Sequence, residues 1–172
     1  IIQHTMLKTI VLVGMMGSGK TSIGKELAKS LNINFIDSDK EIELKCKKTI
    51  PQIFETKGET YFRKIEEKIC VKLIDGNPKV LSLGGGAFLN SAIRRKINKL
   101  GLSIWISPSL ETIYERLSKS KNKRPLLDYK NLKRSIKEIY DSRKEQYNKA
   151  NYTIRTKSDN KKNIVKKIIE IL

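Results

Sequence analysis

The sequence of 172 residues is poor in the residue types on which metal and redox chemistry depend. It has one histidine, His4, and two cysteines, Cys46 and Cys70, which lie far apart and match no zinc or redox spacing. Chemistry that needs a histidine triad or a histidine metal cluster is therefore not expected. The cysteines are interpreted as reduced structural thiols of a cytosolic protein.

Long apolar runs are also missing. No run approaches the roughly 20 residues that a membrane-spanning helix needs, and the first residues lack the basic and apolar regions of a secretory signal. We therefore expect a cytoplasmic protein without a membrane partner. The length fits one domain, with no internal repeat or linker. Met6 looks like a natural start, so this domain is predicted to comprise residues 6–172, with 1–5 an added or upstream segment.

Acidic residues are scarce, with 18 against 36 basic ones, and the net charge is +18. Such a charge invites a nucleic-acid-binding interpretation. However, the lysines are scattered over almost every polar segment, and no basic face interleaved with aromatic residues is evident. We favour a solvated basic surface that helps to attract anionic substrates. The charge alone does not decide between the two.

The strongest local signal is the sequence GMMGSGKT at residues 14–21. A β-branched apolar run, 10–13, precedes it, and a helix-like segment, 22–31, follows it directly. This is the pattern G-x-x-x-x-G-K-[ST] in the strand–loop–helix context that a phosphate-binding loop requires. A glycine-rich turn that binds nothing is the alternative, and it does not explain why Lys and Thr stand in register.

Each part of this loop has a physical role. Gly14 and Gly19 allow backbone angles that other residues avoid. The N–H groups of the loop and of the helix start then converge on an anion. Lys20 supplies a positive charge for the β- and γ-phosphates, and the Thr21 hydroxyl is placed to bind Mg²⁺. The sequence therefore predicts a nucleotide phosphate site.

The rest of the chain alternates short apolar runs with helical patterns. Alternation of this kind predicts an α/β fold with a parallel sheet that helices cover on both sides. Strands are expected at 10–13, 33–36, 79–83, 102–106 and 152–155. Helices are expected at 22–31, directly after Asp39, from 49, at 59–74, from 90 or 91 to 100, from Pro108 to 117, at 131–148 and at 163–172.

Polar or glycine-rich segments follow strands two and three, where ligands collect in parallel sheets. Asp37 and Asp39 suit water-mediated Mg²⁺ binding and acceptance of a hydroxyl proton. Because Asp39 precedes a helix, a simple helix cap is the alternative. The glycines at 84–86 indicate close backbone approach to a ligand, or a turn. The basic stretch at 118–125 has the composition of a mobile loop over an anionic ligand.

Six motifs together resemble the shikimate kinase family along nearly the whole chain. Only the phosphate loop is specific alone, but all six stand in the family's order and spacing. They are GMMGSGKT (14–21), FIDSD (35–39), YFRKIE (61–66), LSLGGGA (81–87), RPLL (124–127) and RKEQY (143–147). The resemblance implies a nucleoside-monophosphate-kinase-like α/β/α fold with a five-stranded parallel sheet and a mobile lid at about 118–127. It also implies a monomer that uses ATP and Mg²⁺ to phosphorylate the 3-hydroxyl of shikimate, in chorismate and aromatic amino acid biosynthesis.

The resemblance also implies roles for individual residues. Catalysis is expected from Asp39, as or beside the base, and from Lys20 and Arg124. ATP would be bound by Gly17, Ser18, Gly19, Lys20, Thr21, Ser22, Arg116 (near the adenine) and Arg124. Shikimate would be bound by Asp39, Arg63, Gly84, Gly85, Gly86 and Arg143, the two arginines gripping its carboxylate. Thr21 would bind the metal, with Asp37 and Ser82 acting through water.

Some features leave alternatives open. The adenine-binding segment, somewhere in 156–160, is too weakly patterned to assign, and Thr21 stands where many relatives have Ser. A kinase of the same fold for gluconate or a nucleoside monophosphate would share the phosphate loop. It would have no reason for Arg63, the three glycines and Arg143 together. A phosphate-loop protein that binds nucleic acid and has lost catalysis is the rival from another class, and the intact Lys20 and Asp39 argue against it.

Overall fold

The computed structural model describes residues 7–157 and 160–172. Within them, five parallel strands form one sheet in the order β2-β3-β1-β4-β5. The strands are β1 Thr9–Val13, β2 Asn34–Asp37, β3 Lys79–Ser82, β4 Gly101–Pro108 and β5 Tyr152–Thr156. Every residue of β1 is buried, as expected for the central strand of a parallel sheet that is covered on both faces. The segment 1–5 and part of the segment 156–160 lie outside the described residues.

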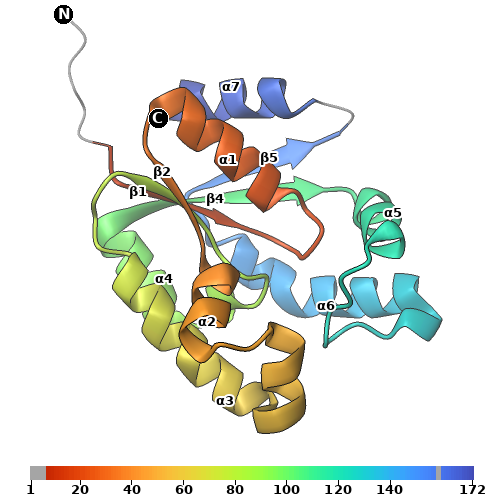
Figure 1. Ribbon diagram of the computed structural model, residues 1–172. Coiled ribbons are helices and arrows are strands. Elements are labelled where there is room, and N and C mark those ends of the chain that lie inside the picture. The colour runs from red at the N-terminus through yellow and green to blue at the C-terminus, as the bar shows by residue number, and fades with distance from the viewer. Residues whose placement is uncertain (1–6, 158–159) are drawn as a thin grey trace, which may run out of the picture.

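Helices cover both faces of this sheet (Figure 1). They are α1 Lys20–Leu31, α2 Ser38–Cys46, α3 Ile50–Leu73, α4 Ser91–Leu100, α5 Leu110–Lys119, α6 Leu132–Tyr147 and α7 Lys161–Ile171, with short 3₁₀ turns at Ala87–Leu89 and Tyr129–Asn131. Helices α1 and α7 pack on one face, where Leu27 and Ile168 meet Leu12 of β1. Helices α3, α4 and α6 cover the other face, where Ile97 packs with Val11. The predicted α/β/α fold with a five-stranded parallel sheet is confirmed.

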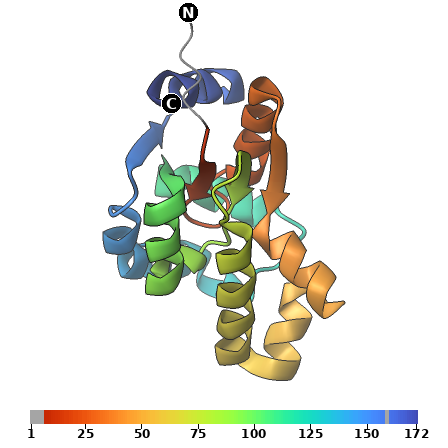
Figure 2. The same ribbon diagram turned by 90° about the vertical axis from the view of Figure 1, so that its left-hand side faces the viewer.

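Helices α2 and α3 form a smaller core away from the sheet. Ile42, Ile53 and Phe62 are buried together there, and Figure 2 shows both helices projecting below the sheet. Helix α3 is kinked at Gly58, whose left-handed φ of 83° interrupts the helical backbone. This kink separates the helix expected from 49 from the helix expected at 59–74. It lets the first turns of α3 pack on α2 while the long second part runs beneath the sheet.

The expected start of α4 is confirmed, whereas that of α5 is not. Asn90 caps α4 by accepting a hydrogen bond from the Ile93 N–H at 3.0 Å. Pro108 was expected to open a helix, and this is wrong: it is the last residue of β4, in register with Thr156 of β5. A strand end tolerates proline because no donor is needed there. Ser109 caps α5 instead, accepting from the Thr112 N–H at 3.2 Å.

Other expectations concern the cysteines and membrane spans. Both Cys46 and Cys70 are free thiols, and Cys70 is fully buried, where burial raises the pKa of its thiol. In the described ranges, none of the helices combines the length and the apolar character needed to span a bilayer.

The phosphate loop, the aspartates and the glycines follow β1, β2 and β3, and they converge at the carboxyl ends of these strands. Because ligands bind at this end of a parallel sheet, the functional site is expected there.

Candidate active site

The phosphate loop closes around the ammonium group of Lys20. Gly19 precedes α1 with a left-handed φ of 94°, a conformation that favours glycine. Lys20 is buried, and its Nζ donates hydrogen bonds to the carbonyl oxygens of Gly14 at 2.7 Å and Met15 at 2.8 Å. Burial lowers the pKa of Lys20 to about 8, the charge of Asp39 opposes this shift, and that of Arg124 adds to it. The loop thus encloses a buried ammonium group, and a bound anion such as a phosphate would stabilise its charged form.

Asp37 connects this loop to the second strand. The Thr21 hydroxyl donates to Asp37 Oδ2 at 3.1 Å, while Asp37 Oδ1 accepts from the Asp39 N–H at 2.9 Å. Asp37 therefore caps α2, and the cap that was considered for Asp39 falls on the neighbouring aspartate. Ser82 is in register with Asp37 on β3. Asp37 and Ser82 thus lie at the ends of adjacent strands, and Thr21 in the first turn of α1 contacts Asp37. All three side chains carry oxygen atoms, the kind of ligand that Mg²⁺ prefers.

These side chains do not form a dedicated metal cage. In residues 7–157 and 160–172 there is no group of three or more His, Cys, Asp or Glu side chains that could hold a metal ion. Mg²⁺ in phosphate-transfer sites usually keeps waters and binds one or two protein groups together with substrate phosphates. A hydroxyl and one carboxylate beside a phosphate loop fit that pattern.

Asp39 lies in the first turn of α2, against the glycines that follow β3. A Cβ on Gly84 would lie 2.5 Å from Asp39 Oδ1, so only glycine leaves room for this carboxylate. The Gly84 N–H donates to Ser38 Oγ at 2.9 Å, which holds the glycine segment on α2. Burial, and then the charge of Asp37, raise the pKa of the Asp39 carboxyl, while the nearby Lys20 lowers it. A carboxylate with a raised pKa beside a cavity is a typical proton acceptor.

Arg63 on α3 faces the same glycine segment. A Cβ on Gly86 would lie 2.6 Å from Arg63 Nη2, and Arg63 Nη1 donates to Glu66 Oε1 at 2.7 Å. Glu66 is only 2% exposed, and burial raises the pKa of its carboxyl, against the lowering effect of Arg63. The sequence reasoning assigned no role to Glu66. The available signal was its position four residues after Phe62, on the apolar side of the predicted helix.

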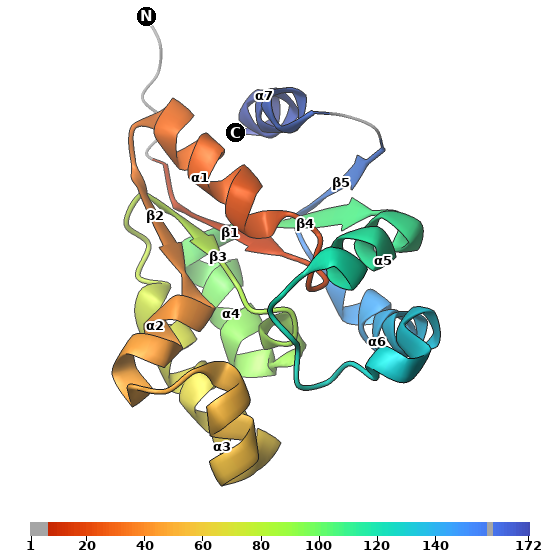
Figure 3. The ribbon, with the colours of Figure 1, turned by 45° about the vertical axis from the view of Figure 1, so that its right-hand side comes forward.

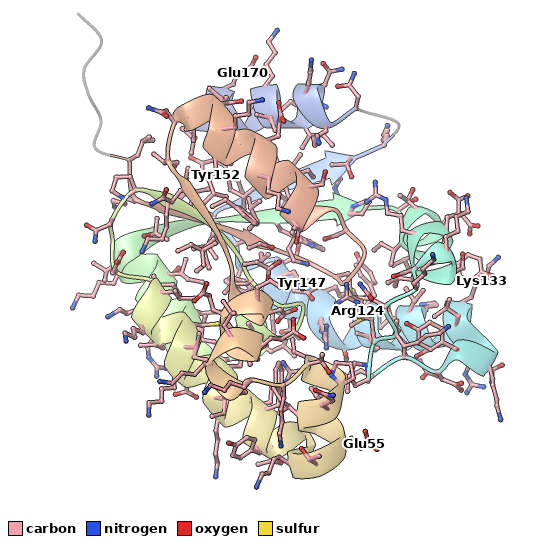
Figure 4. All side chains as sticks on the ribbon, viewed as in Figure 1. Glu55, Arg124, Lys133, Tyr147, Tyr152 and Glu170 are labelled. Carbon is pink, nitrogen blue, oxygen red and sulfur yellow. The ribbon has the colours of Figure 1, made fainter. Side chains whose placement is uncertain are left out.

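Arg143 on α6 completes the cluster. It is 5% exposed, and its Nη1 is buried without a hydrogen-bond partner among the described residues. A Cβ on Gly85 would lie 3.0 Å from this nitrogen, and the Tyr147 hydroxyl donates to the Gly85 carbonyl. Figure 4 places Tyr147 in the middle of the molecule, whereas Lys133, from the first turn of the same helix, lies at its edge. A buried cationic N–H without a partner is costly, and an anion would satisfy it.

Two adjoining cavities bring all of these residues together. The larger has a volume of about 980 Å³ and the smaller about 70 Å³. The larger is lined by Gly17 to Ser22, Asp37, Asp39, Ser82, Gly84, Gly85, Arg116 and Arg124. The smaller is lined by Asp39, Arg63, Gly84, Gly85, Gly86, Arg124 and Arg143. Every site residue predicted from the sequence thus lies in a wall of one or both cavities, with Asp39 and Arg124 at their junction.

The walls also contain residues that the sequence did not single out. Lys161 and Ile164 of α7 line the larger cavity, as do Lys121 and Lys123 of the connection between α5 and α6. Figure 3 shows this connection along the same edge of the sheet as the phosphate loop. The lysine content of 118–125 could have suggested Lys121 and Lys123. Helix α7 is brought to the site by tertiary contacts, namely the pairing of β5 with β4 and the packing of α7 on α1.

The fold and these cavities define a P-loop kinase: a phosphate loop at the carboxyl end of the central strand, with a second cavity beside it. A model of the family described as shikimate kinase matches residues 16–172. The shikimate kinase of Bartonella henselae is 40% identical over 162 residues, which cover 94% of this chain and 77% of that protein. That of Ruegeria pomeroyi is 42% identical over 147 residues, 86% of this chain and 75% of that protein.

A solved structure agrees with these sequence matches. The shikimate kinase from Acinetobacter baumannii in complex with shikimate has a TM-score of 0.90 and 36% identity, and the match covers 98% of this chain and 94% of that one. This chain belongs to the shikimate kinase family. The family predicted from six sequence motifs is therefore confirmed.

Proposed function

We propose that this protein transfers the γ-phosphate of ATP to the 3-hydroxyl of shikimate. The observation that carries the proposal is the buried Nη1 of Arg143 beside Gly85, which has no hydrogen-bond partner in the part of the chain that the structure describes. Arg63 reaches the adjoining Gly86. Two guanidinium groups suit a small carboxylate, because they offer paired donors in a fixed plane. Asp39 and the backbone of the glycine segment supply partners for hydroxyl groups. An acceptor with a carboxylate and several hydroxyls, such as shikimate, fits this set.

The chain's own residues would act mainly by position and charge. The oxygen of the attacking hydroxyl group forms the new bond to the γ-phosphorus, and Asp39 accepts the proton that this hydroxyl group loses. The bond from that phosphorus to the bridging oxygen breaks, and ADP leaves with the electron pair. Lys20 and Arg124 stabilise the negative charge on the transferring group. Raised basicity of Asp39 favours proton acceptance.

The metal site in this proposal is small. Thr21 would bind Mg²⁺ through its hydroxyl, and Asp37 and Ser82 would bind it through water. When bound, the ion neutralises charge on the β- and γ-phosphates. The 3.1 Å contact between Thr21 and Asp37 supports this assignment because it places both oxygens at one point beside the loop.

The segment 118–127 would act as a lid in a single domain of residues 6–172. A lid that closes over both cavities excludes water and limits hydrolysis of ATP. Arg116, whose Nη1 donates to the Gly17 carbonyl at 3.2 Å, would lie near the adenine. We further propose a cytoplasmic monomer without a nucleic-acid or membrane partner.

ADP production from ATP and Mg²⁺ at physiological salt tests the function directly. We expect strong dependence on shikimate and little turnover with gluconate or nucleoside monophosphates, which lack the matching combination of carboxylate and ring hydroxyls. Equal turnover on all acceptors would overturn the assignment. Absence of turnover, together with tight and steeply salt-dependent binding of DNA or RNA, would favour the nucleic-acid-binding alternative.

The shifted pKa of Lys20 predicts a pH dependence of ATP binding. Lys20 loses its charge in the free protein as the pH rises through about 8, whereas ATP binds best to the charged form. The dissociation constant should therefore rise by up to about tenfold per pH unit above that value. Fluorescence of Trp105, the single tryptophan, can report binding, since its Cδ1 lies 3.3 Å from where a Cβ on Gly14 would be. Lys20→Arg, which stays charged, should abolish the dependence; an unchanged pH profile in this variant would contradict the assignment.

Gly84→Ala should lower turnover by about 10²-fold, because a catalytic group misplaced by about 1 Å can cost that much. The new methyl group would meet Asp39 Oδ1 at 2.5 Å and Glu66 Oε2 at 3.2 Å, so the carboxylate must move. Steady-state kinetics and thermal unfolding would check this. Gly58→Ala is the converse control: its Cβ meets no atom within 4 Å, but φ is +83°, so it should lower stability and spare turnover. Unaltered kinetics for Gly84→Ala would show that the contact with Asp39 is unimportant.

A further inference from the structure

The segment that carries Arg124 has little packing of its own. Every residue from 121 to 125 is exposed, yet all five line the larger cavity. An exposed loop loses conformational entropy when its side chain binds a ligand, unless the loop is held in place beforehand. The contacts that hold Arg124 therefore decide how readily its guanidinium reaches the cavities.

Tyr129 makes two contacts with this segment. Its Oη accepts a hydrogen bond from the backbone N–H of Arg124 at 2.9 Å. Lys123 Nζ lies 3.9 Å from the centroid of its ring. The ring is half-buried against the main core, so the phenol is itself well anchored. Figure 4 shows Arg124 on the connection between α5 and α6, facing the centre of the molecule.

Local backbone chemistry adds to this restraint. Pro125 limits the conformation of the residue before it to the extended region. The Arg124 carbonyl accepts from the Leu127 N–H at 3.1 Å, and Leu127 is buried in the core. The backbone N–H and carbonyl of Arg124 are thus both occupied. Of the groups involved, the Tyr129 hydroxyl is the one that ties the N–H of Arg124 to the body of the protein.

We propose that Tyr129 is a positioning residue that holds Arg124 at the junction of the two cavities. The Lys123 ammonium lies over the Tyr129 ring. Of the three cations at 121–125, Arg124 is the one that lines both cavities. The inference rests on the proposed function, in which Arg124 contacts that phosphate. Tyr129 itself lines neither cavity.

Tyr129→Phe tests this, because it keeps the ring and the Lys123 contact and removes only the hydrogen-bond acceptor. We expect kcat/KM for ATP to fall by about 3- to 10-fold, the effect of losing one hydrogen bond, with little change in thermal unfolding. Tyr114→Phe is the matched control. Tyr114 lies on α5 with Lys133 Nζ 4.7 Å from its ring centroid, and it lines neither cavity. Equal effects of the two substitutions would overturn the proposal.

A double-mutant cycle shows whether Tyr129 acts through Arg124. ATP dissociation constants from Trp105 fluorescence should rise with Tyr129→Phe in the unmodified protein and remain unchanged when the same substitution is made in Arg124→Ala. The same fold-change in both backgrounds would mean a general structural role and would overturn the proposal. Because ATP binding needs no acceptor, this result stands apart from the shikimate assay. If shikimate is not the acceptor, this would appear only in the shikimate assay and not in the ATP dissociation constants.

Discussion

Asp39→Asn is expected to lower turnover by about 10²- to 10⁴-fold, the range contributed by a positioned proton acceptor. The amide has the size of the carboxylate and fits beside Gly84, where an added Cβ would come within 2.5 Å of Oδ1. It cannot accept the hydroxyl proton, however. The rate of ADP formation at saturating substrates measures the effect, and calorimetry with ATP measures whether the nucleotide site survives.

The control for this substitution is Asp141→Asn. Asp141 is a carboxylate on the outer face of α6 that pairs with Lys137 and Lys144, and its amide variant should keep normal turnover. A near-normal rate for Asp39→Asn would remove Asp39 from the mechanism.

The raised pKa of Asp39 also predicts a pH dependence. Because burial raises this pKa, the unmodified enzyme should lose activity as the pH falls through the raised value, where the carboxylate becomes protonated.

Arg143→Ala should raise the KM for shikimate by about 30- to 10³-fold, as found when one partner of a buried, hydrogen-bonded charge pair is truncated. The side chain contributes a buried N–H that lacks a partner in the described residues, and the acceptor's carboxylate would supply one. ATP binding should stay close to normal, because the phosphate loop lies on other elements. Arg143→Lys keeps the charge but loses the planar fork of donors. Its KM for shikimate should lie between those of the unmodified protein and Arg143→Ala.

Arg134→Ala on the same helix is the matched control. Its guanidinium is exposed and pairs with Glu138 one turn later, so its removal should leave both Michaelis constants unchanged. Thermal unfolding with added shikimate gives an independent reading, since a ligand that binds the folded state raises the unfolding temperature. The unmodified protein should show this rise and Arg143→Ala should not. Unchanged affinity for shikimate would show that Arg143 is misassigned.

The sequence alone predicted the phosphate loop, because everything that loop needs is local. Glycines that permit left-handed backbone, a lysine and a hydroxyl next to a helix start lie within eight residues, 14–21. The alternation of strands and helices also predicted the parallel sheet. It placed Asp37, Asp39 and the glycine segment at one edge, since carboxyl ends of parallel strands meet there.

Local signals failed where pairing partners are distant. The helix cap that seemed to belong to Asp39 belongs to Asp37, whose second oxygen is held by Thr21 from another element. Pro108, typical of a first helical turn, ends β4 because that strand extends to pair with β5. For Pro108, the pairing of β4 with β5, which are far apart in the sequence, decided between two locally acceptable conformations.

What the sequence determined by itself was the list of chemical groups and the order of the strands and helices that carry them. Tertiary structure alone decided which of these groups are buried and with which partners. Glu66 became a buried partner of Arg63, and the Tyr129 hydroxyl accepts a hydrogen bond from the N–H of Arg124. Arg143 was left with a buried N–H that has no partner within residues 7–157 and 160–172. The physical reason is that burial and hydrogen bonding depend on how α3, α6 and the lid segment pack across the ends of the sheet. That packing is a property of the whole chain.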